Sequence, residues 1–196
     1  MNKTRKTLIS LMGGISLLIA GIAPAAAALT SVVKIAQGSN ISVVSGGALT
    51  VDVIGQNFSV APDGAAFSLS WDPSVLSYVS SAAANAPWNA TYISEAQVSS
   101  GLIDYAFMGI TTNGVNAGAN FGLASFTFNV LGNPGDVTAL ALGNDSYSIG
   151  FINGLTGLDV NYVNSQVQVV PLPAAVWMFG AGLVGMFGAA KRRRPG

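Results

Sequence analysis

The fold of this chain is set by one stretch, Ala66-Phe67-Ser68-Leu69-Ser70-Trp71-Asp72-Pro73-Ser74-Val75-Leu76-Ser77-Tyr78-Val79. Phe67, Leu69 and Trp71 recur at every second position, which is the period of a strand with one apolar face. Asp72-Pro73 then predicts a turn, because aspartate accepts hydrogen bonds from the amides beyond it and proline fixes φ. We therefore expect two strands around this turn, with Trp71 in the core and a structural role for Asp72.

The rest of the segment 29–169 repeats this pattern. Ile103, Tyr105 and Phe107 fall on one face of a predicted strand, and Phe126-Thr127-Phe128-Asn129-Val130 forms another. Turn residues separate the segments, and no helical period of useful length interrupts them. Many short strands with regular turns predict an all-β sandwich or jelly roll. Further strands are predicted at 32–36, 48–54, 75–80, 92–98, 137–142 and 160–169.

Three segments resemble the cohesin family. They are the stretch 66–79 with its Trp-Asp-Pro turn, the segment Gly122-Leu123-Ala124-Ser125-Phe126-Thr127-Phe128-Asn129-Val130, and the opening strand Gly47-Ala48-Leu49-Thr50-Val51-Asp52-Val53. The resemblance implies a nine-stranded jelly-roll β-sandwich over residues 29–169, related to carbohydrate-binding modules. Cohesins bind dockerin modules through a sheet face, so the resemblance also implies a partner-binding role.

Basic residues are concentrated at the two ends of the chain. The 196 residues include eight basic and eight acidic side chains, and the body holds all eight acids against a single base, Lys34, for a net charge of −7. An acidic body without arginine cannot replace the counterions of phosphates, which argues against nucleic-acid binding. The chain has no histidine and no cysteine. Imidazole catalysis, thiolate chemistry and disulfides are therefore excluded.

Residues 1–28 have the organisation of a signal peptide. A basic start with Lys3, Arg5 and Lys6 precedes an apolar segment at 8–22, and four alanines at 25–28 supply the small residues of a cleavage site. Cleavage is predicted between Ala28 and Leu29. The alternative is an uncleaved membrane anchor, against which the short apolar run and the alanine cluster argue.

The C-terminal residues 170–196 contain three parts in a fixed order. A motif with two prolines comes first, followed by the uncharged segment 174–190 and the basic end 191–196. Seventeen helical residues span roughly 25 Å, at the short end of a membrane crossing, and a basic end stays on the cytoplasmic side. The motif consists of Val170, Pro171, Leu172, Pro173 and Ala174, and the basic cluster consists of Lys191, Arg192, Arg193 and Arg194.

This order of motif, span and basic cluster resembles the PEP-CTERM sorting signal of Gram-negative bacteria, in the variant whose motif is VPLPA. The resemblance implies processing by an exosortase, a membrane-embedded enzyme similar to cysteine transpeptidases. Before processing, the C-terminal helix would hold the chain in the membrane. Afterwards the body would be attached to the cell surface or released. A plain C-terminal membrane anchor is the alternative.

Few residues of the body suit catalysis. A glycosidase needs two carboxylates about 5–10 Å apart, and Glu95 and Asp104 stand on neighbouring predicted strands. Eight scattered acids produce such a pair by chance, so we predict no catalytic residue and no enzyme activity. Calcium is the better candidate ligand, because Asp136, Asn144 and Asp145 lie in predicted turns that offer oxygen atoms. Ordinary Asx turns explain the same three residues, and no other cofactor is expected.

Aromatic residues suggest a second kind of site, a surface that stacks on sugar rings. Trp88 lies in the predicted loop Asn85-Ala86-Pro87-Trp88-Asn89, so we expect it to be exposed, with Tyr92 beside it. Tyr105 is assigned to the core. The sequence thus predicts an exported, non-catalytic surface protein whose sandwich binds a polysaccharide or a dockerin-like protein. A purely structural, acidic matrix protein without a specific ligand is the alternative.

Overall fold

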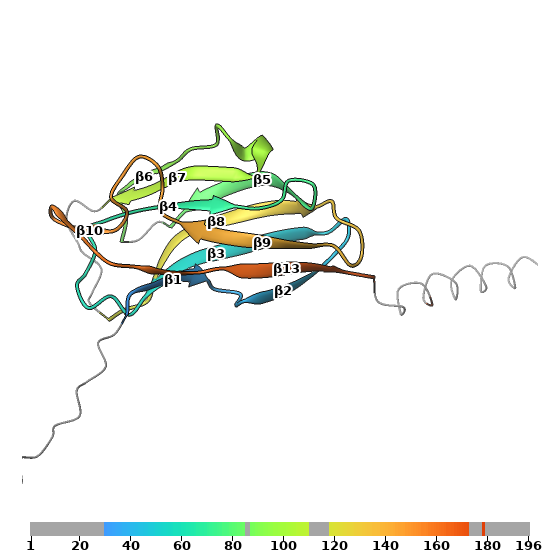
Figure 1. Ribbon diagram of the computed structural model, residues 1–196, viewed down its shortest axis with the longest axis horizontal. Coiled ribbons are helices and arrows are strands. Elements are labelled where there is room, and N and C mark those ends of the chain that lie inside the picture. Colours follow the sequence, from blue (N-terminus) through green and yellow to red (C-terminus); the bar gives the residue numbers. More distant parts are fainter. Residues whose placement is uncertain (1–29, 85–86, 110–117, 173–177, 179–196) are drawn as a thin grey trace, which may run out of the picture.

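The computed structural model describes residues 30–84, 87–109, 118–172 and 178. The predicted signal peptide, its cleavage junction, most of the predicted membrane segment and the basic end lie outside these residues. Within the described part of the chain, no helix has the length and apolar character that a membrane crossing requires. The described body consists of two layers of β-strands with one short 3-10 helix (Figure 1).

One layer is a five-stranded sheet with the order β12-β1-β3-β8-β5. Its centre is the antiparallel pair β3 and β8, which runs in register from Ala48 opposite Asn129 to Gly55 opposite Phe121. The register shifts once, between Val53 and Ile54. The members are β1 (Val32–Ile35), β3 (Ala48–Gln56), β5 (Leu76–Ala83), β8 (Phe121–Val130) and β12 (Asn161–Val163).

The other layer is an eight-stranded sheet. Six strands follow the order β11-β10-β4-β9-β13-β2, β7 also pairs with β4, and β6 pairs with β7. The 3-10 helix η1 (Val98–Ser100) lies between β6 and β7 in the chain. The members are β2 (Asn40–Val44), β4 (Gly64–Ser70), β6 (Ala90–Ile93), β7 (Leu102–Gly109), β9 (Val137–Gly143), β10 (Ile152–Asn153), β11 (Thr156–Gly157) and β13 (Ser165–Val170).

The first and last parts of the body each pass from one layer to the other. The chain leaves β1 through a turn at Gly38, where φ is 100°, and the Ser165 hydroxyl donates to the Gly38 carbonyl at 2.6 Å. Asn164 separates β12 from β13, and its side-chain oxygen accepts from the Leu142 amide at 3.0 Å. β1 pairs in parallel with β12, and β2 pairs in parallel with β13. The two ends of the body therefore lie side by side in both sheets.

The core lies between the two sheets and is lined by the alternating apolar residues. Phe67 and Leu69 of β4 and Phe126 and Phe128 of β8 are fully buried, and Trp71 is nearly so. Phe67 meets Phe126 edge to face with ring centroids 6.3 Å apart, and Trp71 meets Phe128 at 5.0 Å. These contacts join the two layers, and they confirm the core positions expected from the stretches 66–79 and 126–130.

The turn after Trp71 also forms as predicted. One carboxylate oxygen of Asp72 accepts from the Ser74 amide at 2.8 Å and from the Ser74 hydroxyl at 2.6 Å. The hydroxyl bond, followed by the amide bond, lowers the pKa of Asp72 because both favour the charged carboxylate. Asp72 therefore has a structural role in closing the turn.

The prediction for β7 is wrong in its second half. Ile103 points into the core, but Tyr105 and Phe107 are half-exposed, whereas Ala106 and Met108 are buried. Pairing with β4 explains the change, because Phe67 lies opposite Ala106 but Leu69, two residues later, lies opposite Ile103. β7 thus holds one residue more than β4 in this interval, which is a β-bulge. The extra residue shifts the alternation and places two aromatic rings on the outer face.

Three other segments differ from the sequence prediction. The strand expected at 92–98 ends at Ile93, and its last expected residue, Val98, begins η1. The strand expected at 160–169 is divided into β12 and β13, since the chain changes sheet at this point. The short strands β2, β10 and β11 were not predicted, because two to five residues carry too little alternation to stand out.

Candidate functional site

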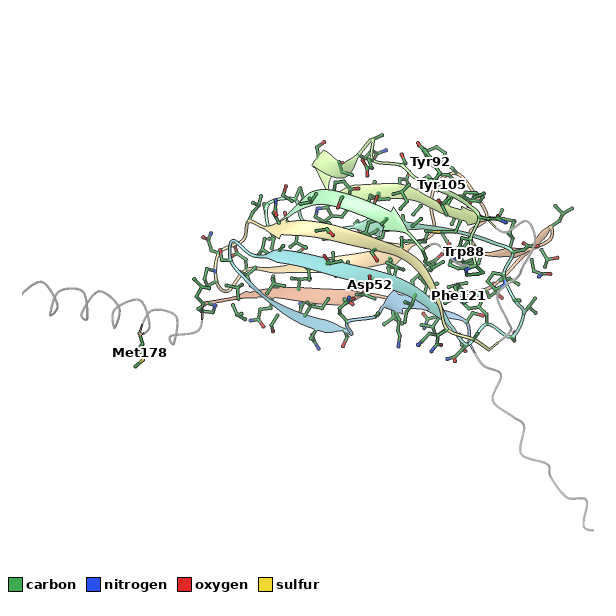
Figure 2. All side chains as sticks on the ribbon, turned by 180° about the vertical axis from the view of Figure 1, so that it is seen from behind. Asp52, Trp88, Tyr92, Tyr105, Phe121 and Met178 are labelled. Carbon is green, nitrogen blue, oxygen red and sulfur yellow. The ribbon has the colours of Figure 1, made fainter. Side chains whose placement is uncertain are left out.

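The outer face of the eight-stranded sheet has a pocket lined by three tyrosines. Tyr92 of β6, Tyr105 of β7 and Tyr147 of the loop after β9 surround a volume of about 340 Å³, together with Ser94. We call these four residues the tyrosine pocket. Tyr92 and Tyr105 lie together at the β6 side of the sheet (Figure 2). Tyr92 and Tyr147 are 59% and 72% exposed, so both rings face solvent.

The pocket rings contact one another at steep angles. The Tyr105 ring is 6.1 Å from the Tyr92 ring with 47° between their planes, and 5.8 Å from the Tyr147 ring with 72° between their planes. Phe107, which lies opposite Tyr92 in the sheet, also stacks on Tyr105, with ring centroids 6.0 Å apart and 15° between their planes. The rings therefore form the walls of a recess, in contrast to a flat platform.

The loop that supplies Tyr147 is held in place by two aspartates. One oxygen of Asp145 accepts from the Tyr147 and Ser148 amides at 2.9 and 2.7 Å, and its other oxygen accepts from the Ser148 hydroxyl at 2.7 Å. Ser146 donates to Asp104 of β7 at 2.9 Å. These bonds fix the loop to itself and to the strand that carries Tyr105, so the pocket is preorganised.

Two acidic side chains, Asp104 and Asp145, lie beside the pocket. Burial, and then the charge of Asp145, raises the pKa of Tyr105. Burial, and then the same charge, raises the pKa of Tyr162 to about 12, and the Tyr162 hydroxyl donates to Asn144 at 2.9 Å. The only base in the segment 29–169 is Lys34, which belongs to β1 of the other sheet. The pocket therefore lies in a negative electrostatic field.

Trp88 is not part of this surface, and the prediction that it is exposed is wrong. Its side chain is only 3% exposed, its indole N–H donates to the Gly122 carbonyl at 2.7 Å, and its ring meets Phe121 edge to face at 5.7 Å. Figure 2 shows Trp88 near Phe121, apart from Tyr92 and Tyr105. The loop before β6 thus folds its tryptophan inward because the indole finds both an apolar cavity and an acceptor.

The three predicted calcium ligands do not come together. Asp136 immediately precedes β9, whereas Asn144 and Asp145 follow it. Seven strand residues at ~3.3 Å each place the two ends about 23 Å apart, too far for one ion. Asp136 instead accepts from the amide of Asn133, three residues before it, at 2.7 Å, so its carboxylate closes the local turn. Among the described residues, no three acidic side chains gather at one point.

The two carboxylates considered for glycosidase chemistry are bound to different partners. Glu95 accepts from the hydroxyls of Tyr78 and Ser81, both in β5. Asp104 accepts from Ser146 in the loop after β9. Glu95 thereby connects the edges of the two sheets, and Asp104 supports the tyrosine pocket, so each carboxylate has a structural explanation.

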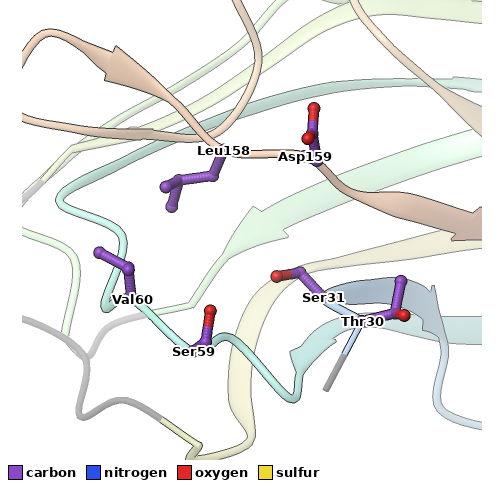
Figure 3. Close-up of a pocket in the computed structure, with 6 residues that line it drawn as sticks. All are labelled: Thr30, Ser31, Ser59, Val60, Leu158 and Asp159. Carbon is purple, nitrogen blue, oxygen red and sulfur yellow. The ribbon is translucent and has the colours of Figure 1, made fainter. Parts of the chain in front are cut away.

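A second recess lies between the segment before β1 and two loops that join the two sheets. Thr30, Ser31, Ser59, Val60, Leu158 and Asp159 line a volume of about 340 Å³ (Figure 3). It offers hydroxyl groups and one carboxylate but no aromatic ring. The tyrosine pocket is therefore the better candidate for a binding site.

The predicted sorting motif begins inside the sandwich. Val170 is the last residue of β13 and lies opposite Val44 of β2. Pro171 and Leu172 follow as exposed residues. Pro173 and Ala174, like the basic cluster, lie outside the described residues. The motif thus starts within the last strand, and its exposed residues Pro171 and Leu172 come directly after that strand.

Sequence reasoning identified Tyr92 but missed Tyr147 and assigned Tyr105 to the core. Tyr147 stands in the segment Asn144-Asp145-Ser146-Tyr147-Ser148-Ile149-Gly150, where two large apolar residues occur in a loop rich in turn formers. That combination is the available signal, because apolar residues in such a loop face solvent unless the loop folds onto the core.

Comparison with known proteins supports the fold. A scan against protein-family models and a search of curated proteins return no match for this chain. Among solved structures, it is similar to the cohesin of a type I cohesin–dockerin complex from Clostridium thermocellum, with a TM-score of 0.58, 11% identity, and 74% of this chain and 96% of that chain covered.

Two further solved structures agree with this likeness. A type I cohesin from Pseudobacteroides cellulosolvens gives a TM-score of 0.53 at 16% identity, covering 74% of this chain and 94% of that one. A non-cellulosomal cohesin from Archaeoglobus fulgidus gives 0.51 at 17% identity, covering 72% and 91%. The described body of this chain therefore has a cohesin-like β-sandwich fold.

Proposed function

We propose that this chain is an exported, non-catalytic binding module that docks a partner at the tyrosine pocket of its cohesin-like sandwich. The observation that carries the proposal is the exposure of Tyr92 and Tyr147 beside Tyr105 in a preorganised recess. Exposed tyrosines have a large contact area and lose little conformational entropy on binding, which makes them frequent anchors of interfaces.

The partner is proposed to be a dockerin-like protein or a surface polysaccharide. The solved cohesins from Clostridium thermocellum and Acetivibrio cellulolyticus were determined in complex with dockerins, which supports a protein partner. Sugar rings also pack on aromatic faces, which keeps a saccharide as the second candidate partner.

Export and sorting are the second part of the proposal. The segment 1–28 would be removed as a signal peptide between Ala28 and Leu29, and an exosortase would process the tail at the VPLPA motif. The position of Val170 at the end of β13 supports this, since a cut beyond it would leave every strand of the sandwich intact. The mature body would stay at the cell surface or in the extracellular matrix of a Gram-negative bacterium.

Mass spectrometry of the mature protein tests the sorting. We expect an N-terminus at Leu29 and a C-terminus within or shortly after residues 170–174. A mature protein that still ends at Gly196 would refute exosortase processing, and one that still begins at Met1 would refute signal cleavage.

A glycan array and a pull-down from the secretome of the producing organism test the binding. Saturable binding should be lost in Tyr92→Ala and retained in Val79→Ala. Val79 is a fair control because it is 50% exposed and belongs to β5 of the opposite sheet. Absence of any saturable ligand, with the protein abundant in the exopolysaccharide fraction, would instead favour a structural matrix protein.

A further inference from the structure

The chemistry of the tyrosine pocket restricts the chemical class of the ligand, and this inference rests on the proposed docking site. We propose that the pocket receives a cationic group, a lysine or arginine side chain of a basic protein segment. Two features of the structure carry this inference: the arrangement of the rings and the distribution of charge around them.

The rings form a corner that suits a compact cation better than a sugar. Sugar chains stack on flat, coplanar aromatic platforms, whereas the Tyr147 and Tyr92 rings stand at 72° and 47° to the Tyr105 ring. A cation within about 6 Å of several ring centroids is attracted by each ring quadrupole. Tyr92 and Tyr147, which are 59% and 72% exposed, are the rings that can offer a cation such a contact.

The charges have the sign that a cation requires. Asp104 and Asp145 flank the pocket, and both oxygens of Asp145 are already engaged by its own loop. Asp145 therefore supplies a negative field to the pocket and has little capacity to bind sugar hydroxyls. The body as a whole carries eight acids and one base. Complementary charge then favours a basic partner and speeds the encounter with it.

The test uses the full chain and two probes, an oligolysine peptide and the same peptide with its lysines acetylated. We expect saturable binding of oligolysine and none of the acetylated peptide. Tyr92→Leu keeps an apolar side chain but removes the ring, so it should weaken binding about fivefold or more, whereas Tyr92→Phe should stay within about twofold. Equal loss in Tyr92→Phe would overturn the inference, because the hydroxyl would then be the recognised group.

Charge variants distinguish binding at the tyrosine pocket from a non-specific attraction of the basic peptide to an acidic protein. Asp104→Asn keeps an acceptor for Ser146 and removes one charge beside the pocket, and Asp136→Asn removes one charge at the far end of β9. Binding should weaken about threefold or more in the first and remain nearly unchanged in the second, because screening limits surface charges to about 10 Å. Equal losses in both variants would overturn the inference.

The results also distinguish a failure of the cationic ligand from a failure of the proposed docking site. A soluble polysaccharide that binds in a Tyr92-dependent manner, with oligolysine inactive, would refute the cationic ligand and leave the docking site standing. If neither the peptide nor any glycan or secretome protein binds in a Tyr92-dependent manner, both are refuted.

Discussion

Replacement of Trp88 by alanine tests whether Trp88 is a core residue or a surface residue. An indole buries roughly 200 Å² on folding, which at about 25 cal/mol per Å² stabilises the fold by about 5 kcal/mol. Trp88 is 3% exposed, so nearly all of this area is buried in the folded protein. Its N–H bond to the Gly122 carbonyl adds about 1 kcal/mol. Relaxation of the cavity returns part of the loss, so we expect Trp88→Ala to lower the free energy of unfolding by about 4 kcal/mol.

Urea denaturation of the protein, followed by circular dichroism, measures this change. Trp88→Phe keeps an aromatic ring but removes the donor to Gly122, and should lose about 2 kcal/mol. Tyr92→Ala is the surface control and should stay within about 0.5 kcal/mol of the wild type. If Trp88→Ala unfolds within about 1 kcal/mol of the wild type but fails to bind a ligand, Trp88 is a surface contact and the reasoning is refuted.

Two further predictions concern backbone conformation and alkaline pH. Gly101→Ala should be strongly destabilising, by about 3 kcal/mol or more, because φ is 78° and the new Cβ would lie 2.2 Å from the Trp71 carbonyl oxygen. Gly46→Ala, with φ of 75° and open space around it, should lose only about 1 kcal/mol; similar midpoints in urea for the two variants would contradict this steric argument. Burial raises the pKa of Tyr162 to about 12, and burial followed by the bond to Glu95 raises that of Tyr78 to about 12. The folded state therefore holds these protons more tightly than the unfolded state, and stability should be full below pH 10 and fall between pH 10 and about 12. A double Tyr→Phe variant should flatten this decline in a pH series of urea midpoints, and an unchanged decline would show that other groups cause it.

The layered fold could be predicted from two local patterns in the sequence, the alternation of apolar residues and the turn residues. Phe67 and Leu69 are buried as their alternation predicts, and the turn at Asp72 forms through the bonds expected of an aspartate before proline. These features depend only on neighbouring residues, so sequence reasoning reaches them. The pairing of first and last strands across two sheets joins residues more than a hundred positions apart, as in Gln166 opposite Asn40. No local pattern carries that information.

The tyrosine pocket was less predictable, because one inserted residue in β7 determines which face of the sheet carries Tyr105. The bulge in β7 moves Tyr105 from the expected core face to the outer face, and a bulge leaves no reliable mark in a single sequence. The error for Trp88 is the reverse, because it was expected at the surface and is buried. Its hydrogen-bond acceptor is the Gly122 carbonyl, 34 positions later in the chain. The expected exposure of Tyr92 is confirmed, whereas its role in binding stays a prediction.

The parallel pairing of β2 with β13 has a mechanical consequence. The chain enters the sandwich at β1 at one end and leaves it after β13 at the opposite end (Figure 1). A force that draws the two ends apart pulls β1 and β13 in opposite directions, so it shears the parallel pairs β1–β12 and β2–β13 along their length. The five register pairs between β2 and β13 then bear the load together, whereas an unzipping geometry would break them in succession. The sandwich therefore resists tension applied along the axis that joins its two ends.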